Sequence, residues 1–232
     1  EHPAVRRMLD TQRAWVDGGR VLAYRTGLEL DRIRHGNPEE SAAAQRWCAL
    51  VTPVLKAAWT HQAFHGGSEC LQVFGGHGYV REWGIEQILR DARVAMIYEG
   101  TNEIQAIDLL ARKIVPDGAA SLNALLDEIA TDLDAAGRER LEQLRSCTAT
   151  VVQAASVNAT LPFQVADDYL RALTLVLLDW AWQRIDAQLP ADTPERATRW
   201  QAPLQALRTW VLPESAMRVG IIHGLVHTHA TA

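Results

Sequence analysis

The chain has 232 residues, of which 48% are hydrophobic and 22% are charged, as in an ordinary globular protein. Residues 1–116 carry 14 acidic and 14 basic side chains, whereas residues 117–232 carry 14 acidic and 9 basic ones, so the formal net charge of −5 arises in the second half. A nucleic-acid-binding protein concentrates positive charge, and no apolar run here reaches the roughly 20 residues of a membrane span, so both classes are disfavoured.

The start of the chain and its cysteines bear on origin and compartment. The chain begins at Glu1 without an initiator Met and without a basic-then-apolar signal segment, which we interpret as a fragment or a processed product. The three cysteines form no CxxC pair and have no metal-ligand spacing. Because a sparse, odd set of cysteines is typical of a reducing compartment, we expect a cytoplasmic protein.

A helical pattern runs through the first half of the chain. Pro3 suits a helix start, and Gly36 with the proline that follows predicts the first turn. Pro53 should kink or split the second helix, Gly66 and its neighbour Gly67 should end it, and Thr101 is placed to cap a later one. The helices expected here are residues 3–35, 39–64, 69–74, 84–94 and 102–115.

The second half predicts a further helical bundle. Pro116-Asp117-Gly118 indicates a boundary, so we expect two domains, residues 1–116 and 117–232. Residues 169–180 are apolar almost all round, which places them at the centre of a bundle. The predicted fold class is therefore all-α, an up-down helical bundle followed by a second helical bundle. The helices expected in the second part are residues 119–135, 138–159, 162–189, 194–211 and 214–226.

Two glycine-containing loops carry the candidate chemistry. The first is QVFGGHGY at residues 72–79, where three glycines in four residues indicate positive φ angles or a close approach to something bulky. The second is IYEGTNEIQ at residues 97–105, which presents Glu99 on a turn before a helix, with an apolar run behind it. A carboxylate with apolar neighbours is typical of a general base, but these features alone leave the function open.

In order and spacing, QVFGGHGY, then RDAR at residues 90–93, then IYEGTNEIQ resemble the C-terminal signature of the acyl-CoA dehydrogenase family. The resemblance covers roughly residues 1–115. The opening EHPAVRRML and the stretch LVTPVLKAAWTHQA at residues 50–63 resemble a longer-chain branch of that family, which includes 3-methylmercaptopropionyl-CoA dehydrogenase-like enzymes. Members of that branch carry an extra C-terminal helical domain, with which the second half of this chain is consistent.

The resemblance implies α,β-desaturation of an acyl-CoA thioester. A glutamate removes the α proton, the β hydrogen leaves as a hydride to FAD, and an electron-transferring flavoprotein reoxidises the flavin. The base of the family maps onto Glu99, Gly100 matches a position against the acyl-CoA, and Tyr98 should flank the same pocket. Positions that match FAD contacts in the family are Gln72, Val73, Phe74, Gly75, Gly76, Thr101, Asn102 and Glu103.

The resemblance also implies an oligomer. The loop at residues 72–76 meets an FAD that is bound mainly by a neighbouring subunit in the family, so a homodimer or homotetramer is expected. Some members place the base on an earlier helix, and Glu99 favours the commoner arrangement. The Arg-x-x-Phe-Gly FAD motif and the two preceding domains of the family are not in this sequence, so this chain alone is expected to be inactive.

Simpler structural interpretations exist for the residues of these motifs and for two histidines. Glu99 could be a solvated turn residue, and Asp91 and Arg93 most simply form a structural ion pair or cap. His61 and His65 have helical i, i+4 spacing, but no third ligand is evident, so no metal site is expected. The alternative function is that of a non-catalytic relative with a nucleic-acid-binding or damage-response role, which the acidic second half disfavours.

Overall fold

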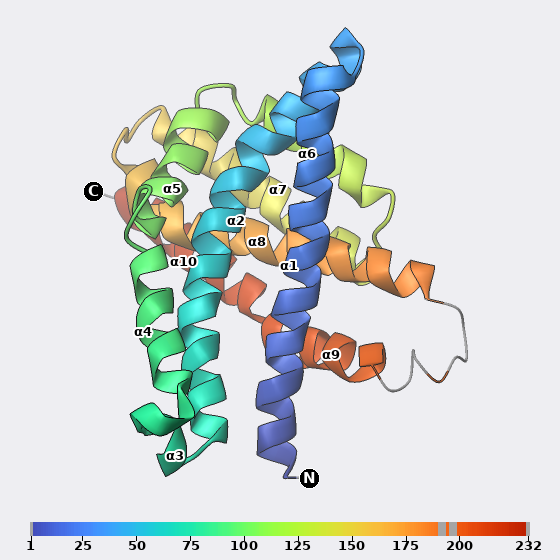
Figure 1. Cartoon of the computed structure of the whole chain (residues 1–232). Coiled ribbons are helices and arrows are strands. Elements are labelled where there is room, and N and C mark those ends of the chain that lie inside the picture. The colour runs from blue at the N-terminus through green and yellow to red at the C-terminus, as the bar shows by residue number, and fades with distance from the viewer. Residues whose placement is uncertain (1, 190–193, 195–198, 231–232) are drawn as a thin grey trace.

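The computed structural model describes residues 2–189, 194 and 199–230, and regular structure in this part of the chain is helical throughout (Figure 1). The all-α prediction is confirmed. None of the described helices is long and apolar enough to cross a membrane. The helices are α1 (Pro3–His35), α2 (Pro38–Val73), α3 (Gly76–Tyr79), η1 (Arg81–Trp83), α4 (Ile85–Ala95), α5 (Asn102–Ile107), η2 (Asp108–Ile114), α6 (Ala120–Ala130), α7 (Ala135–Ala155), α8 (Leu161–Gln188), α9 (Gln201–Ala206), η4 (Leu207–Val211) and α10 (Glu214–Ala230).

The first two helices form a long antiparallel hairpin (Figure 1). Its turn lies where glycine and proline predict it, and α2 begins with a reciprocal capping box. The Asn37 side chain accepts a hydrogen bond from the Glu40 backbone N–H at 2.9 Å, and the Glu40 carboxylate accepts one from the Asn37 N–H at 3.0 Å. Two backbone donors that the helix start would otherwise leave unpaired are thereby satisfied.

The predicted end of the second helix at Gly66 is wrong, because α2 continues to Val73 and also passes through Pro53 without a split. A Cβ atom added at Gly66 would lie 2.1 Å from Oε1 of Gln12 on α1. The glycine therefore allows α1 and α2 to approach each other closely and does not break the helix. The separate helix expected at residues 69–74 is the last part of α2.

The later helices agree with the predicted pattern with shifted ends, whereas the short α3 and η1 were not predicted. The helix expected at residues 102–115 is divided into α5 and the π-helical η2, and the one expected to end at residue 211 into α9 and the π-helical η4. For the helix expected at residues 194–211, most of the first turn and part of the preceding break fall on residues 190–193 and 195–198. These lie outside the described residues.

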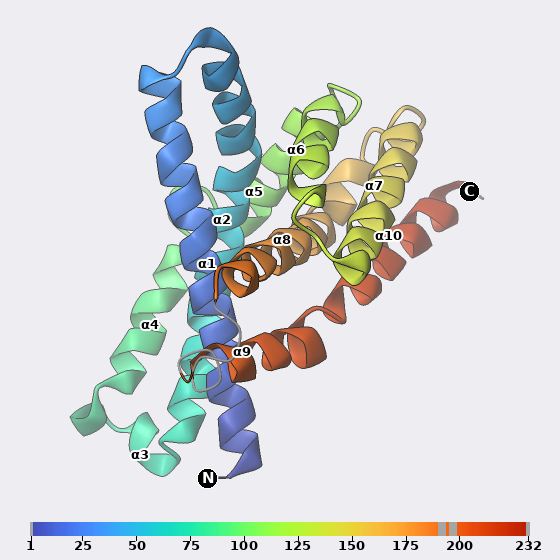
Figure 2. The same cartoon turned by 90° about the vertical axis from the view of Figure 1, so that its right-hand side faces the viewer.

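Helix α8 is the central element, as its apolar sequence predicts. It packs against α1, α2, α5, α7 and α10, and Figure 2 shows it between the α1–α2 hairpin and the pair formed by α7 and α10. The main hydrophobic core takes residues from both sides of the expected boundary, for example Leu22, Leu109, Leu126 and Leu177, all fully buried. Hydrophobic packing thus continues across the turn at residues 116–118, where the two-domain division was placed.

Candidate functional site

The two motif loops lie at opposite ends of α4 (Figure 1). Helix α4 has 11 residues, so at about 1.5 Å per residue it separates the loops by roughly 16 Å. Within one chain the structure therefore does not bring the glycine loop at residues 72–76 together with the turn at residues 98–103. Each must be considered as a site of its own.

The turn that carries Glu99 has an unusual backbone. Glu99 and Gly100 are consecutive left-handed residues, with φ angles of 56° and 83°. This conformation is open to glycine but costs a residue with a side chain roughly 1–2 kcal/mol. The Asn102 N–H closes the turn by donating to the Met96 carbonyl at 3.2 Å, and the Thr101 hydroxyl caps α5 by accepting from the Ile104 N–H at 3.4 Å, as predicted.

The Glu99 carboxylate is exposed at the surface, and no hydrogen bond or ion pair to another described residue holds it. Its neighbour Tyr98 is 54% exposed, and Ile97 is similarly exposed. The turn thus combines a carboxylate that is free to accept a proton with apolar side chains around it. This arrangement suits a general base once a ligand or another surface covers the turn.

Two side chains donate hydrogen bonds to backbone carbonyls of the turn. The Gln105 side-chain amide donates to the Glu99 carbonyl at 3.0 Å, and the Lys56 ammonium on α2 donates to the Gly100 carbonyl at 2.6 Å. Both carbonyls next to the Glu99–Gly100 peptide bond are therefore fixed by a named donor. Sequence reasoning did not find either residue, because nothing in the linear order relates Lys56 to a turn that follows more than forty positions later.

The side chain of Asn102, a residue predicted to contact FAD, lies inside the chain and not at its surface. The residue is only 6% exposed, and its side chain points to α2: Nδ2 donates to the Ala57 carbonyl at 3.1 Å, and Oδ1 accepts from Lys56 at 3.0 Å and from Thr60 at 3.0 Å. Both acceptor positions of Oδ1 and one of the two N–H groups of Nδ2 are thus used within the chain. The side chain thus anchors the turn to α2 within the chain, and an FAD contact at residue 102, which stays a prediction, would fall to its backbone.

Glu103 is a partner in the cap of α5. A backbone N–H and the Thr101 hydroxyl hydrogen-bond to its carboxylate and hold the pKa of Glu103 below its usual value. Burial lowers the pKa of Lys56, while the nearby Glu99 and Glu103 carboxylates act in the opposite direction. The ammonium thus lies within electrostatic reach of both acidic side chains of the turn.

The glycine loop at residues 72–76 differs from the turn, because the backbone at its glycines is exposed. Gln72 and Val73 belong to the last turn of α2, and Phe74 is partly exposed, with its ring 6.1 Å from the Trp83 ring. Gly75 has a φ angle of 59°, and a Cβ atom added to Gly75 or Gly76 would meet no atom within 4 Å. An exposed aromatic ring beside a bare backbone suits contact with a large flat group, such as a flavin nucleotide.

The segment from α3 to the turn, residues 76–101, is named here the outer arm. It leaves large apolar side chains in contact with solvent, of which Tyr79 is 82% and Trp83 56% exposed. Helix α4 buries none of its residues within the chain. Exposed apolar surface of this kind marks a contact with a ligand or another protein surface. The sequence did not predict this exposed surface, because an apolar residue contributes the same helical periodicity whether this chain or a partner covers it.

The other predicted features form no second chemical site. The rings of His61 and His65 lie 4.1 Å apart, and no group of three potential metal ligands occurs among the described residues. The expected ion pair of Asp91 with Arg93 is not found in the described part of the chain, where the Arg93 guanidinium lies over the Phe64 ring at 5.8 Å.

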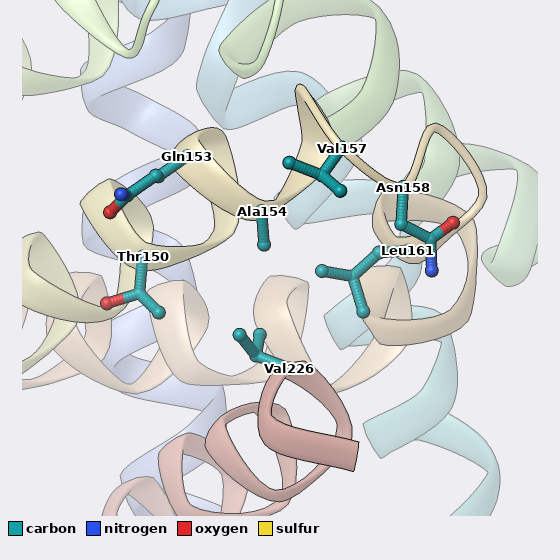
Figure 3. Close-up of a pocket in the computed structure, with 7 residues that line it drawn as sticks. All are labelled: Thr150, Gln153, Ala154, Val157, Asn158, Leu161 and Val226. Atoms are coloured by element: carbon teal, nitrogen blue, oxygen red, sulfur yellow. The ribbon is translucent and has the colours of Figure 1, made fainter. Parts of the chain in front are cut away.

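A separate hollow lies at the junction of α7, α8 and α10 (Figure 3). It has a volume of about 380 Å³, and its walls are mainly apolar, with the buried side chains of Leu161 and Val226 among them. None of the predicted site residues lines it, and it contains no charged side chain that could transfer a proton. The described residues that line it are Thr150, Gln153, Ala154, Val157, Asn158, Leu161 and Val226.

The first half of the chain is similar to known proteins. Residues 1–114 match the family described as acyl-CoA dehydrogenase, C-terminal domain. The chain is 44% identical over 130 residues to a 3-methylmercaptopropionyl-CoA dehydrogenase of Ruegeria pomeroyi, a match of 56% of this chain and 22% of that protein. It is 37% identical over 153 residues to the broad-specificity linear acyl-CoA dehydrogenase FadE5 of Mycobacterium tuberculosis, covering 64% of this chain and 25% of that protein.

Solved structures share the fold. Caenorhabditis elegans ACDH-11 in complex with C11-CoA superposes with a TM-score of 0.56 at 20% identity, over 84% of this chain and 33% of that one. An acyl-CoA dehydrogenase of Bacillus anthracis complexed with FAD gives a TM-score of 0.60 at 17% identity, over 99% of this chain and 41% of that one. The chain thus spans about a quarter or less of the curated relatives named above.

Proposed function

We propose, because residues 1–114 match the C-terminal domain of acyl-CoA dehydrogenases, that the protein containing this chain is a member of that family and desaturates an acyl-CoA thioester between its α and β carbons. Glu99 is the proposed base for the α proton. The observation that carries this proposal is the exposed Glu99 carboxylate, which is unpaired among the described residues, on a left-handed turn with two carbonyls that side chains hold.

The proposed chemistry accounts for a turn whose backbone is held by hydrogen bonds and whose side chains are exposed. The α proton of a thioester is too weakly acidic for a carboxylate in water, so the base must be held in place and poorly hydrated when it acts. Exposed apolar side chains such as Ile97 and Tyr98 would exclude water when substrate covers the turn. Gly100, without a side chain, allows the substrate to approach the backbone, and Tyr98 flanks the same face.

FAD is the proposed cofactor, and when bound it would accept the β hydrogen as a hydride. The proposed contacts on this chain are the open glycine loop (Gln72, Val73, Phe74, Gly75 and Gly76) and, beyond the base, Thr101, Glu103 and the backbone of residue 102. Because roughly 16 Å of helix separates the two loops, we assign them to FAD molecules of different subunits. A homodimer or homotetramer would then complete each site and cover the outer arm.

The remaining parts of the proposal concern the whole protein. An electron-transferring flavoprotein is the proposed partner that reoxidises the flavin, and the cytoplasm is the proposed compartment. This chain covers only 22% of its relative from Ruegeria pomeroyi, so the rest of the flavin and CoA site is assigned to other parts of the polypeptide. The chain by itself is therefore expected to be inactive.

The test is the Glu99→Gln variant of the full-length flavoprotein, assayed with a panel of acyl-CoA chain lengths. Removing a general base lowers rates by about 10²–10⁴-fold, so bleaching of the flavin absorbance by acyl-CoA should fall at least about 100-fold while FAD stays bound. Glu39→Gln, which removes the same charge from an exposed position in the first turn of α2, should bleach normally. Undiminished turnover in Glu99→Gln would overturn the assignment, and a wild-type flavoprotein that no acyl-CoA bleaches would favour the non-catalytic alternative.

A further inference from the structure

We infer that Lys56 is a positioning residue for the Glu99 base, which it serves by anchoring the turn to α2 through the Gly100 carbonyl and the Asn102 side chain. The inference rests on the proposed function of Glu99 and adds to it a residue from a different helix. Lys56 lies on α2 and the turn lies between α4 and α5, so the contact joins segments that are distant in sequence.

The geometry makes Lys56 a bridge. Its Nζ donates to the Gly100 carbonyl at 2.6 Å and to Oδ1 of Asn102 at 3.0 Å. Asn102 is in turn fastened to the next turn of α2 through the Ala57 carbonyl and the Thr60 hydroxyl. The turn is therefore tied to α2 at two points, its glycine and its closing residue, and one ammonium group serves both.

The turn needs such an anchor because apolar packing supplies little. Ile97, Tyr98 and Glu99 are exposed within the chain, so none of these three side chains is buried to hold the turn in place. Glu99 also occupies a left-handed conformation that a residue with a Cβ atom disfavours. The Gln105 bond to the Glu99 carbonyl opposes rotation of the Glu99–Gly100 peptide, and the Lys56 bond to the Gly100 carbonyl opposes rotation of the next peptide, Gly100–Thr101. Together they fix the backbone on which the Glu99 carboxylate is carried.

Lys56 and Gln105 hold two successive peptides of the turn by different chemistry. The Gln105 amide is neutral and belongs to α5, directly after the turn, whereas the Lys56 donor is charged and lies near the Glu99 and Glu103 carboxylates. Charge-assisted hydrogen bonds are the stronger kind. Loss of Lys56 should therefore loosen the turn more than loss of Gln105 does.

The chain offers a matched control in its other lysine. Lys113 on η2 donates to the Ala49 carbonyl of α2 at 2.9 Å and pairs with Asp108 at 2.7 Å. It thus makes the same kind of lysine-to-carbonyl contact with the same helix, but it does not contact the turn. A change that Lys113→Met shares with Lys56→Met would reflect general stability and not positioning.

The experiment compares Lys56→Met, Lys56→Arg, Gln105→Leu and Lys113→Met in the full-length flavoprotein. In single turnover, Lys56→Met should bleach the flavin about 10- to 100-fold more slowly, with acyl-CoA affinity changed less than about threefold, because a misaligned base loses rate more than binding. Lys56→Arg should restore part of the rate, since it keeps a charged donor. Gln105→Leu should cause a smaller loss and Lys113→Met none.

A second readout does not depend on turnover. Amide hydrogen exchange of residues 96–102, measured without substrate, should be faster in Lys56→Met and unchanged in Lys113→Met. Wild-type bleaching in Lys56→Met, or equal losses in both lysine variants, would overturn the inference. If Glu99→Gln keeps full activity while exchange in Lys56→Met still rises, the proposed base is wrong and the anchor stands as a structural one only.

Discussion

Helices α4 and α8 are both rich in apolar residues, yet one buries nothing within the chain and the other is buried along most of its length. Trp83 beside α4 is 56% exposed, whereas Trp182 on α8 is fully buried. The indole N–H of Trp182 also donates to the Ala14 carbonyl at 2.8 Å, so its polar atom is satisfied inside the core.

The difference separates stability from function. The neighbours of α8 on several sides are helices of this same chain, so its side chains should determine whether the chain folds. The outer arm packs chiefly on α2 and turns its other apolar side chains outward. Those side chains should contribute little to folding and much to contacts with cofactor, substrate or a second subunit.

The largest effect on folding is expected at Trp182. Trp182→Ala removes a fully buried ring and leaves the Ala14 carbonyl without its donor, which should lower the free energy of unfolding by about 3–5 kcal/mol. Denaturant unfolding followed by circular dichroism measures this loss. An effect below about 1 kcal/mol would show that α8 is not the centre of the folding unit.

The next largest effect is a pH dependence of stability at His61. This residue lies on α2, which packs against both α4 and α8. Burial, with the nearby His65 and Arg171, lowers the pKa of His61 to about 4. The unfolded chain takes up this proton near pH 6.5, at higher pH than the folded chain does, so stability is lost as the pH falls from about 6.5 to 4. Since His61 is only partly buried, we expect the loss to be about 1–2 kcal/mol.

The pH dependence is tested by unfolding wild type and His61→Gln across this range. The variant carries no ionisable ring, so its stability should fall less steeply between pH 6.5 and 4. Parallel curves for the two proteins would assign the acid sensitivity to other groups, such as the Glu214 carboxylate, whose pKa is lowered by its hydrogen bonds to Arg171 and Arg218 against the effect of its burial.

A smaller effect is expected in the turn. Gly100 has a φ angle of 83°, and a Cβ atom there would lie 3.3 Å from Nε2 of Gln105. Gly100→Ala should therefore cost about 1 kcal/mol of unfolding free energy. In the full-length flavoprotein, a weakened affinity for acyl-CoA should accompany the substitution, and calorimetric titration would detect it. Normal affinity would contradict the close approach assigned to this glycine.

The smallest effect on folding is expected at Trp83. Trp83→Ala removes a mostly exposed ring, so the unfolding free energy of the chain should change by less than about 0.5 kcal/mol. In the full-length protein the same change should reduce FAD content or weaken subunit association, as shown by flavin absorbance and sedimentation. A folding loss comparable to that of Trp182→Ala would erase the distinction between the two regions.

The sequence by itself determined what depends on near neighbours in the chain. The start of α1 at Pro3, the turn at Gly36, the cap at Thr101 and the central place of residues 169–180 all agree with the structure. Capping involves residues a few positions apart, and helical periodicity reveals which faces are apolar. The three motifs likewise indicated the family, because their order and spacing are linear features.

Only the tertiary structure decided what depends on residues far apart. Gly66 has the same side chain whether it breaks a helix or, as here, admits Gln12 from a neighbouring one. The turning of Asn102 towards α2 and the bridge made by Lys56 require two helices to be in place. Exposure of the outer arm follows the same rule, because hydrophobicity is a property of a residue, whereas burial is a property of its surroundings.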